Sequence, residues 1–452
     1  MSAPRSARLI AFSLWIALLS LAGCAVYHPV SLPAAPDLTP EPALTVPASE
    51  FWLPGLEPHR FPANGLDETA VVTLAVFDNP DLKAARLQTG VARAQLLQAG
   101  LLPDPQLSAG LATSDLNYGG DVGLSEDLRA LITRGAATAG ARAHQQQVYL
   151  NILWQEWQVA EKARELFIQL RSDEELRDML ASTRDFFADR YHQDQAAMQK
   201  GDVTLPTVTA DLTLLTNAET KLRQLQLNAS AARHQLNQLL GLQPDAQIRL
   251  TGSAASQPLS KQAFQAAVAA LPHRRADLLA LQAGYEAQEQ TVREAVLAQF
   301  PDLTAGVVLS RDPVEGVNSF GPTVSLSLPL FNRNRGQIAV QRATRAVLRQ
   351  TYQARLDEAA GQADQVWKAA NILQAQLRDL DARLSVLEST AAAARKDFRE
   401  GNLAAASYVN VESSLLAAQA EAIELGASLE GAQSALQALL GLPLGTPAIS
   451  AK

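Results

Sequence analysis

Residues 320–330 read FGPTVSLSLPL, and this stretch decides the fold class because apolar side chains alternate along it with small or polar ones. A period of two is typical of a β-strand with one apolar face. Residues 303–309 (LTAGVVL) alternate in a similar way, and residues 311–318, which contain proline and glycine, are typical of a turn. The sequence therefore predicts a hairpin with one apolar face.

The first half of the chain holds a weaker version of this hairpin. Leu107, Ala109 and Leu111 share one face of an expected strand, and residues 117–120 (NYGG) indicate a turn. The strand after this turn is less regular, because Glu126 interrupts its apolar face. We expect two pairs of strands, near residues 105–128 and 301–331.

Long helices are expected between and after the hairpins. The chain is 47% apolar and 19% charged but only 5% aromatic, which favours long packed helices over a compact sheet core. Residues 141–200 contain neither glycine nor proline. As a helix, such a segment spans roughly 90 Å at a rise of about 1.5 Å per residue.

Sequence markers recur 200 residues apart, which indicates a duplication. Gly201 and Gly401 are one such pair, and the sequence LLGL at 239–242 returns at 439–442. Between these markers, apolar residues follow steps of three and four, as in a coiled coil. They are Leu215, Ala218, Leu222, Leu225, Ala229, Ala232, Leu236 and Leu239, and all eight positions remain apolar when shifted by 200. We predict two helix-strand repeats, residues 65–257 and 258–443, with a tail at 444–452.

The segment before the repeats is interpreted as a secretory signal followed by an arm. Residues 1–23 carry two arginines before an apolar run that is too short to span a bilayer. This run ends in LAGC, which resembles a bacterial lipobox and implies that Cys24 is acylated, for instance with palmitate. Ala25, in place of an aspartate, implies the outer membrane. Residues 24–64 are rich in proline and are expected to form a lipidated, extended arm.

Several classes of function are excluded by what the sequence lacks. The net charge of −8 and the absence of a basic block argue against nucleic acid as a partner. The six histidines are scattered, so no metal site is expected. Motifs for nucleophiles and for nucleotide cofactors are also missing, and we predict neither an enzyme nor a cofactor.

The strands predict an oligomer if they lie in a membrane. Lipid would cover the apolar side chains Val324, Leu326, Leu328 and Leu330, since no globular segment is available to do so. Membrane barrels begin at eight strands, and an open sheet edge in hydrocarbon costs several kcal/mol per unpaired group. Four strands per chain therefore require several copies, giving eight or twelve strands.

Residues 321–336 (GPTVSLSLPLFNRNRG), the two glycine turns and the two LLGL endings together resemble the TolC family of outer-membrane efflux proteins, and in particular its lipidated members. The resemblance extends from Cys24 to about Leu442. It implies a mainly helical fold with membrane strands, in which long antiparallel coiled-coil helices form a periplasmic α-barrel below a trimeric twelve-stranded β-barrel.

The resemblance also implies a function. A homotrimer in the outer membrane would be the passive exit duct of a tripartite efflux system, receiving small molecules from a periplasmic adaptor and an inner-membrane pump, expected to be of the resistance-nodulation-division type. Drugs, metal ions and a secreted polypeptide stay open as cargo. The alternative is a lipid-anchored periplasmic coiled-coil scaffold or adaptor that does not span the membrane, and the alternating strands argue against it.

Two turns would form the periplasmic tip, contacting the adaptor and closing the pore. Their residues are Lys200, Gly201, Asp202 and Val203 in the first turn and Glu400, Gly401, Asn402 and Leu403 in the second. A simpler reading makes the two glycines ordinary helix caps, and both roles are compatible. Thr207 and Ser407 stand where family members often carry a constricting aspartate. Asp202, Asp211, Glu400 and Glu412 are candidates for a lumenal acidic ring instead, and no gate residue is assigned.

Overall fold

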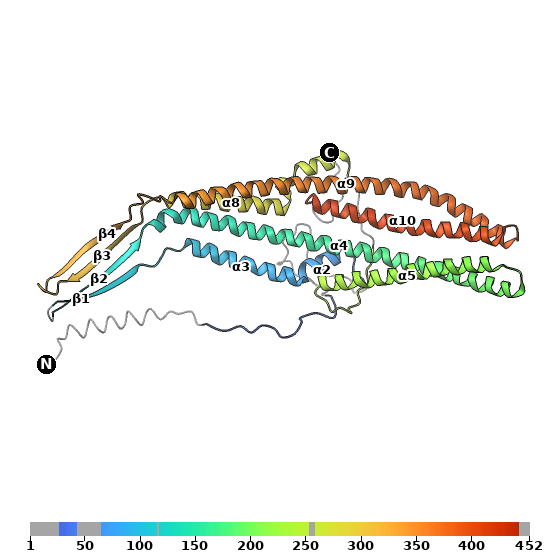
Figure 1. The fold of residues 1–452 in the computed structure, drawn as a ribbon, viewed down its shortest axis with the longest axis horizontal. Helices are drawn as coiled ribbons and strands as arrows, with labels where there is room; N and C mark the ends of the chain where they lie inside the picture. The colour runs from blue at the N-terminus through green and yellow to red at the C-terminus, as the bar shows by residue number, and fades with distance from the viewer. Residues whose placement is uncertain (1–26, 43–64, 115–116, 253–257, 443–452) are drawn as a thin grey trace. The chain divides into compact units, whose positions relative to one another are not determined.

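The computed structural model describes residues 27–42, 65–114, 117–252 and 258–442. The expected signal peptide, the expected lipidation site Cys24 and the expected tail at 444–452 lie outside these residues. The chain divides into two units, residues 1–38 and 39–452. The described part of the first unit contains no helix or strand. All elements below belong to the second unit (Figure 1).

Each half of the second unit contains short helices, a hairpin and two long helices. The first half consists of α2 (Glu68–Asp78), α3 (Pro80–Gly100), β1 (Gln106–Ser114), β2 (Asn117–Asp127), α4 (Arg129–Lys200) and α5 (Leu205–Leu239). The second consists of α6 (Lys261–Ala269), α7 (Leu271–Arg274), α8 (Ala276–Leu297), β3 (Leu303–Arg311), β4 (Asn318–Leu326), α9 (Arg335–Arg399) and α10 (Ala405–Leu439). The long helices and the strands of the predicted fold class are confirmed.

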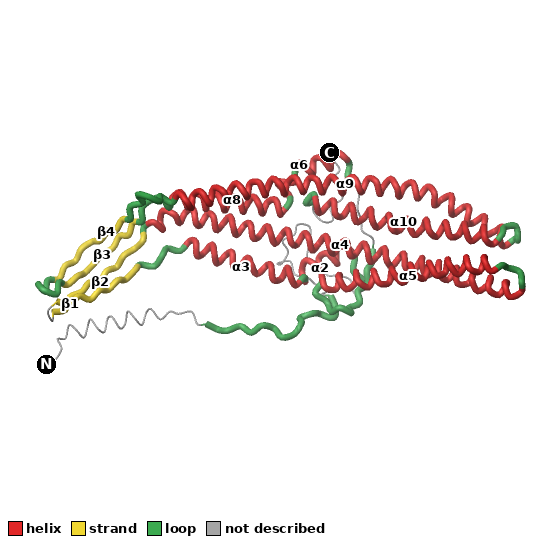
Figure 2. The backbone as a smooth tube through the Cα atoms, viewed as in Figure 1, coloured by secondary structure: helices red, strands yellow, loops and turns green. Residues whose placement is uncertain are grey.

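The strands form one antiparallel sheet in the order β1-β2-β3-β4, so the two hairpins join through β2 and β3 (Figure 2). Strand β4 is shorter than predicted. It ends at Leu326, and Leu328 and Leu330 lie beyond it, which corrects their expected place in the strand. Ser327 N–H still donates to the carbonyl of Asp302 at 3.0 Å, but Pro329 has no N–H with which to continue the ladder.

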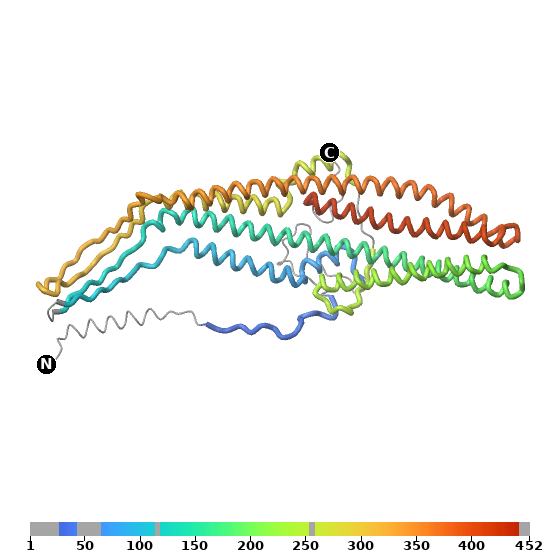
Figure 3. Tube along the Cα trace, in the orientation of Figure 1, coloured from blue at the N-terminus to red at the C-terminus, as the bar shows by residue number. Residues whose placement is uncertain are grey.

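The helices next to the sheet pack in a row. Helix α3 packs on α4, α4 on α8, and α8 on α9, so the row ends at α3 and α9 just as the sheet ends at β1 and β4. Farther from the sheet, α4 packs with α5 and α10, and α10 packs with α9 (Figure 3). Helices α4 and α9 therefore extend from the row of helices next to the sheet into the helix pairs farther from it.

The main apolar cores lie midway along the long helices. In the first repeat, Val71 of α2 packs with Phe167 of α4 and Leu236 of α5, all almost fully buried. In the second, Leu271 and Leu278 pack with Ala363 of α9. The short helices thus attach each hairpin of long helices near its middle. Much of the predicted coiled-coil seam is buried, namely Ala218, Leu222, Leu225, Ala232 and Leu236.

Candidate functional site

One face of the sheet is apolar across all four strands. The register places Val122 opposite Leu309, and Leu309 opposite Phe320. The apolar members of this face are Leu107, Ala109, Leu111, Tyr118, Val122, Leu124, Leu303, Ala305, Val307, Leu309, Phe320, Pro322, Val324 and Leu326, and the same face also carries Thr113, Gly120, Glu126, Arg311 and Asn318. The larger ones are exposed, up to 97% for Leu111. We call this surface the apolar face.

The opposite face, called here the polar face, carries mainly small side chains. It consists of Ser108, Gly110, Ala112, Gly119, Asp121, Gly123, Ser125, Asp127, Thr304, Gly306, Val308, Ser310, Ser319, Gly321, Thr323 and Ser325, with the strand-end residue Gln106. A Cβ atom at Gly306 would lie 2.5 Å from the carbonyl oxygen of Leu124, so glycine is required there. Among the described helices, none is long and apolar enough to cross a membrane.

Both predicted tip turns have the same backbone geometry. Gly201 has a φ of 84° and Gly401 a φ of 76°, in the left-handed region that favours glycine. In the first turn, Gly201 N–H donates to Met198 O at 3.0 Å and the next N–H donates back to Ala197 O at 3.0 Å. The second turn repeats both bonds, and this Schellman pattern ends a helix without leaving its last carbonyls unpaired.

The predicted tip residues lie together in these two turns, at the end of the long helices away from the sheet (Figure 3). Six of the eight are exposed, namely Lys200, Gly201, Asp202, Glu400, Gly401 and Asn402. Val203 and Leu403 are half-buried. The turns thus present a polar surface with one partly covered apolar side chain each.

Behind the first turn, two buried carboxyl groups share one arginine. Arg190 of α4 donates through Nη2 to Asp194 Oδ2 at 2.9 Å, and its Nε lies 3.8 Å from Asp211 Oδ2 of α5. Burial, reinforced by the hydrogen bond and the negative charge of Asp194, raises the pKa of Asp211 to about 6. Asp211 therefore takes part in a buried contact between α4 and α5, which leaves it poorly placed to line a lumen.

Behind the second turn, one buried carboxylate has its own arginine. Arg395 Nη2 of α9 donates to Glu412 Oε2 of α10 at 2.7 Å, and Glu412 is 4% exposed. The hydrogen bond with Glu412 raises the pKa of Arg395 above its usual range. Glu412 likewise belongs to an interhelical ion pair.

Aromatic side chains connect the two pairs of helices near the tip. Tyr408 of α10 stacks on Phe398 of α9 with ring centroids 4.6 Å apart, and it meets Phe186 of α4 edge-on at 6.0 Å. The guanidinium of Arg190 lies 5.9 Å from the centroid of the Phe398 ring. These contacts hold the α4–α5 pair and the α9–α10 pair together just behind their turns.

Asp211 and Glu412 were predicted only as candidates for a lumenal acidic ring, yet the seam contained a signal for the burial of Asp211. Continuing the three-four spacing backward from Leu215 by four residues reaches Asp211. The same backward step of four from Leu415 reaches Val411, so the spacing indicates the burial of Asp211 but not that of Glu412. A charged residue at a seam position predicts a buried ion pair, because a coiled coil covers that position.

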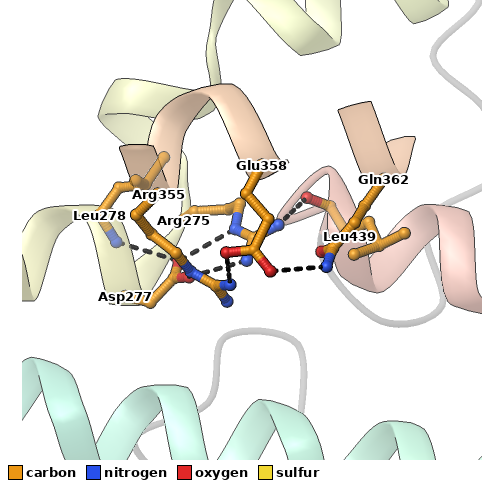
Figure 4. Close-up of polar contacts among 7 residues, drawn as sticks. All are labelled: Arg275, Asp277, Leu278, Arg355, Glu358, Gln362 and Leu439. Carbon is orange, nitrogen blue, oxygen red and sulfur yellow. Dashed lines mark hydrogen bonds and ion pairs between the residues drawn. The ribbon is translucent and has the colours of Figure 1, made fainter. Parts of the chain in front are cut away.

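A second polar cluster ties four helices together near the middle of the molecule (Figure 4). Arg275, at the start of α8, is 1% exposed and donates to Asp277 Oδ1 at 2.9 Å and to Leu439 O of α10 at 3.2 Å. Arg355 of α9 donates to the same carboxylate at 2.8 Å. Both guanidinium groups lie over the Trp154 ring of α4, at 4.8 and 5.8 Å from its centroid.

The charges in this cluster are balanced. Burial alone would raise the pKa of Asp277, but the hydrogen bonds and positive charges of Arg275 and Arg355 outweigh it and hold the pKa below its usual range. Arg355 also bonds Glu358, which accepts from Gln362 at 3.0 Å. Since its donors and acceptors are satisfied within the chain, the cluster is an internal clamp rather than a ligand site.

In the part of the chain that the structure describes, no group of His, Cys, Asp and Glu is arranged to hold a metal ion. The polar groups that cluster do so between helices, as ion pairs. The features that distinguish this chain are therefore surfaces, namely the two faces of the sheet and the two tip turns.

Comparisons with known proteins agree with these surfaces. Residues 267–442 match the family model described as outer membrane efflux protein. No curated protein sequence matches the chain. Among solved structures, CusC is similar to this chain, with 16% sequence identity and a TM-score of 0.68. The match covers 93% of this chain and 100% of the CusC chain, whose structures are described as showing the conformational changes that accompany folding and transmembrane channel formation.

Two further structures are similar over both repeats. The outer membrane protein VceC from Vibrio cholerae has 19% identity over 83% of this chain and 96% of its own, with a TM-score of 0.66. The outer membrane channel CmeC from Campylobacter jejuni has 17% identity over 84% of this chain and 87% of its own, also with a TM-score of 0.66. The family is one of channels rather than enzymes. The family model falls on the second repeat and the fold of the channels extends over both, so residues 267–442 resemble the outer membrane efflux proteins and the two repeats together have the fold of such channels.

Proposed function

We propose that three copies of this chain form a passive exit duct across the outer membrane. The observation that carries the proposal is the open four-stranded sheet, one face of which carries exposed apolar side chains on all four strands. In water such a face is unfavourable, whereas lipid covers it at no cost. The two outer strands β1 and β4 need partners in hydrocarbon, and further copies of the sheet supply them.

The helices next to the sheet also support a closed ring of several copies. Leu87 and Val91 on α3 are 76% and 59% exposed, and Val340 and Val347 on α9 are 56% and 63% exposed. These apolar side chains lie on the two helices that end the row, directly below the two strands that end the sheet. Pairing α3 of one copy with α9 of the next would bury them and continue the ring.

The number three is taken from the family resemblance, which gives twelve strands. The lipid anchor at Cys24 is likewise carried over from the sequence, as is a periplasmic adaptor at the tip with an inner-membrane pump of the resistance-nodulation-division type behind it. The exposed residues of the tip turns, Lys200, Asp202, Glu400 and Asn402, are the proposed adaptor contacts. Small molecules, such as drugs or metal ions, are the proposed cargo.

Opening would require the two helix pairs to separate behind the tip. The aromatic contact between Phe186 and Tyr408 joins these pairs within one copy. Energy for transport would come from the pump. We propose that binding of the adaptor at the tip turns shifts the pairs apart and admits substrate to a water-filled lumen.

Cross-linking between copies tests the ring. Val91 lies nine residues before the end of α3, and Val347 lies twelve after the start of α9, so both stand at about 14–18 Å from the sheet end of their helices. Val91→Cys combined with Val347→Cys should give dimer and trimer bands with a short bismaleimide. Cys24 is the only native cysteine, so new cross-links are readily assigned.

Val386 provides the matched control. It is 63% exposed like Val347 and lies on the same helix, but it is about 77 Å from the start of α9. Val91→Cys with Val386→Cys should therefore give no bands between copies. Equal cross-linking in both pairs, or absence of the protein from the outer-membrane fraction, would favour the scaffold alternative over the duct.

A further inference from the structure

The charges on the polar face of the sheet are all acidic. Among its described strand residues, the face carries two ionisable side chains, Asp121 and Asp127. Asp127 lies at the end of β2 next to the helices, where its Oδ1 accepts from the N–H of Arg129 at 2.9 Å. Asp121 lies inside the strand, away from that junction.

The Asp121 carboxylate lies over Gly110 of the neighbouring strand. Asp121 pairs with Gly110 on β1 and with Ser310 on β3. A Cβ atom at Gly110 would lie 2.4 Å from Asp121 Oδ1, so the carboxylate occupies the space that a side chain on the neighbouring strand would take. Asp121 is exposed, and no basic group of the described residues forms an ion pair with it.

We propose that Asp121 gives the strand portion of the duct a preference for cations. The proposal rests on the proposed function, since it needs the apolar face to meet lipid and the polar face to line the lumen. Twelve strands enclose a lumen with a radius of about 12 Å. Three copies then place three unpaired carboxylates around it at one height, between side chains too small to shield them.

The size of the effect follows from this radius. Three unit charges at about 12 Å from the axis, in water, enrich a monovalent cation there about fivefold without screening and deplete an anion equally. With Debye lengths of about 30 Å at 0.01 M salt and about 10 Å at 0.1 M, the cation-to-anion ratio contributed by Asp121 is about tenfold and about threefold respectively. In 1 M salt, where the length is about 3 Å, it vanishes.

Reversal potentials in planar bilayers test the proposal with the full-length chain in a KCl gradient. Asp121→Asn should lower the ratio of potassium to chloride permeability by about threefold in 0.1 M salt and more in dilute salt. Combining Asp121→Asn with Ser310→Asp moves the carboxylate to the paired residue on β3, on the same face. This double variant should restore the wild-type ratio.

Glu315→Gln is the matched control. It removes one exposed carboxylate per copy from the β3–β4 turn, outside the strands, and should leave the ratio close to wild type. A conducting wild type whose ratio is unchanged in Asp121→Asn would overturn the role of Asp121 while leaving the duct intact. Because a closed tip would block the current, all variants are also measured in a Phe186→Ala background, which removes the contact of Phe186 with Tyr408 between the helix pairs, and a chain that carries no current in that background would contradict the proposed duct itself.

Discussion

Glu161 provides a test of how the two repeats are joined. It lies on α4, and both of its carboxylate oxygens accept from Ser434 Oγ of α10, at 3.2 and 3.1 Å. Burial raises the pKa of Glu161 to about 7, and the opposing effects of Arg164 and Ser434 do not cancel it. This carboxyl group therefore crosses its titration range near neutral pH, at a contact between the first and second repeats.

The sign and size of the effect follow from linkage. A carboxyl group with a higher pKa in the folded chain binds its proton more tightly there, so its contribution favours folding at low pH. That contribution is lost as the pH rises from about 4.5, the ordinary value, to about 7. Raising the pKa from 4.5 to about 7 corresponds to about 3 kcal/mol, an upper limit because Glu161 is only half-buried.

Thermal melts of the detergent-solubilised chain measure this directly. Glu161→Gln keeps the shape of the side chain without its charge, so it should raise Tm by a few degrees at about pH 8 and change it little at about pH 5. Asp178→Asn is the control, since Asp178 lies on the same helix, is exposed and pairs with Arg177 at 2.9 Å. A difference between Glu161→Gln and the wild type that is the same at both pH values would refute the reasoning.

Three further substitutions test other parts of the fold. Gly201→Ala and Gly401→Ala should each lower the free energy of unfolding by about 1–2 kcal/mol, because both residues have positive φ, and denaturant titration measures the loss. Arg275→Ala should cost about 3–5 kcal/mol by leaving Asp277 buried without its closest partner, which hydrogen exchange of α8 would detect. Val324→Lys should disfavour membrane insertion by about 2–4 kcal/mol and reduce the yield of protein in the outer membrane, whereas Thr323→Lys, on the polar face, should leave the yield unchanged.

The hairpins and long helices were predictable because their signals are local. Alternation over residues 303–309 and 320–330 reports a strand with two unlike faces, whatever packs against it. The end of β4 was placed too far along because Leu328 and Leu330 continue the alternation, although Pro329 cannot donate to the ladder. Here one missing N–H overrode an otherwise regular pattern.

The clamp at Arg275 was not predictable in the same way. Its partners come from α8, α9 and α10, and Leu439 is 164 positions away from Arg275 in the sequence. Nothing in the local sequence distinguishes Arg275 from exposed arginines elsewhere in the chain. Only the packing of the helices makes it one of the most buried side chains, so its role follows from the fold and not from a motif.

The duplication predicts the backbone of the two tip turns but not the buried charges behind them. Their turns repeat at a spacing of 200, because a single glycine in the left-handed region is enough to specify each one. The buried charges behind them do not repeat in kind. Arg190 meets two carboxyl groups and leaves an excess negative charge when both are ionised, whereas Arg395 meets Glu412 alone. Because the pKa of Asp211 is about 6, the cluster of Arg190, Asp194 and Asp211 gains its second negative charge near neutral pH. The ion pair of Arg395 and Glu412 keeps one positive and one negative charge. The two tip turns thus share a backbone geometry, but the charged groups behind them respond differently to pH. The reason is that the packing of α4, α5, α9 and α10 buries different side chains behind each turn.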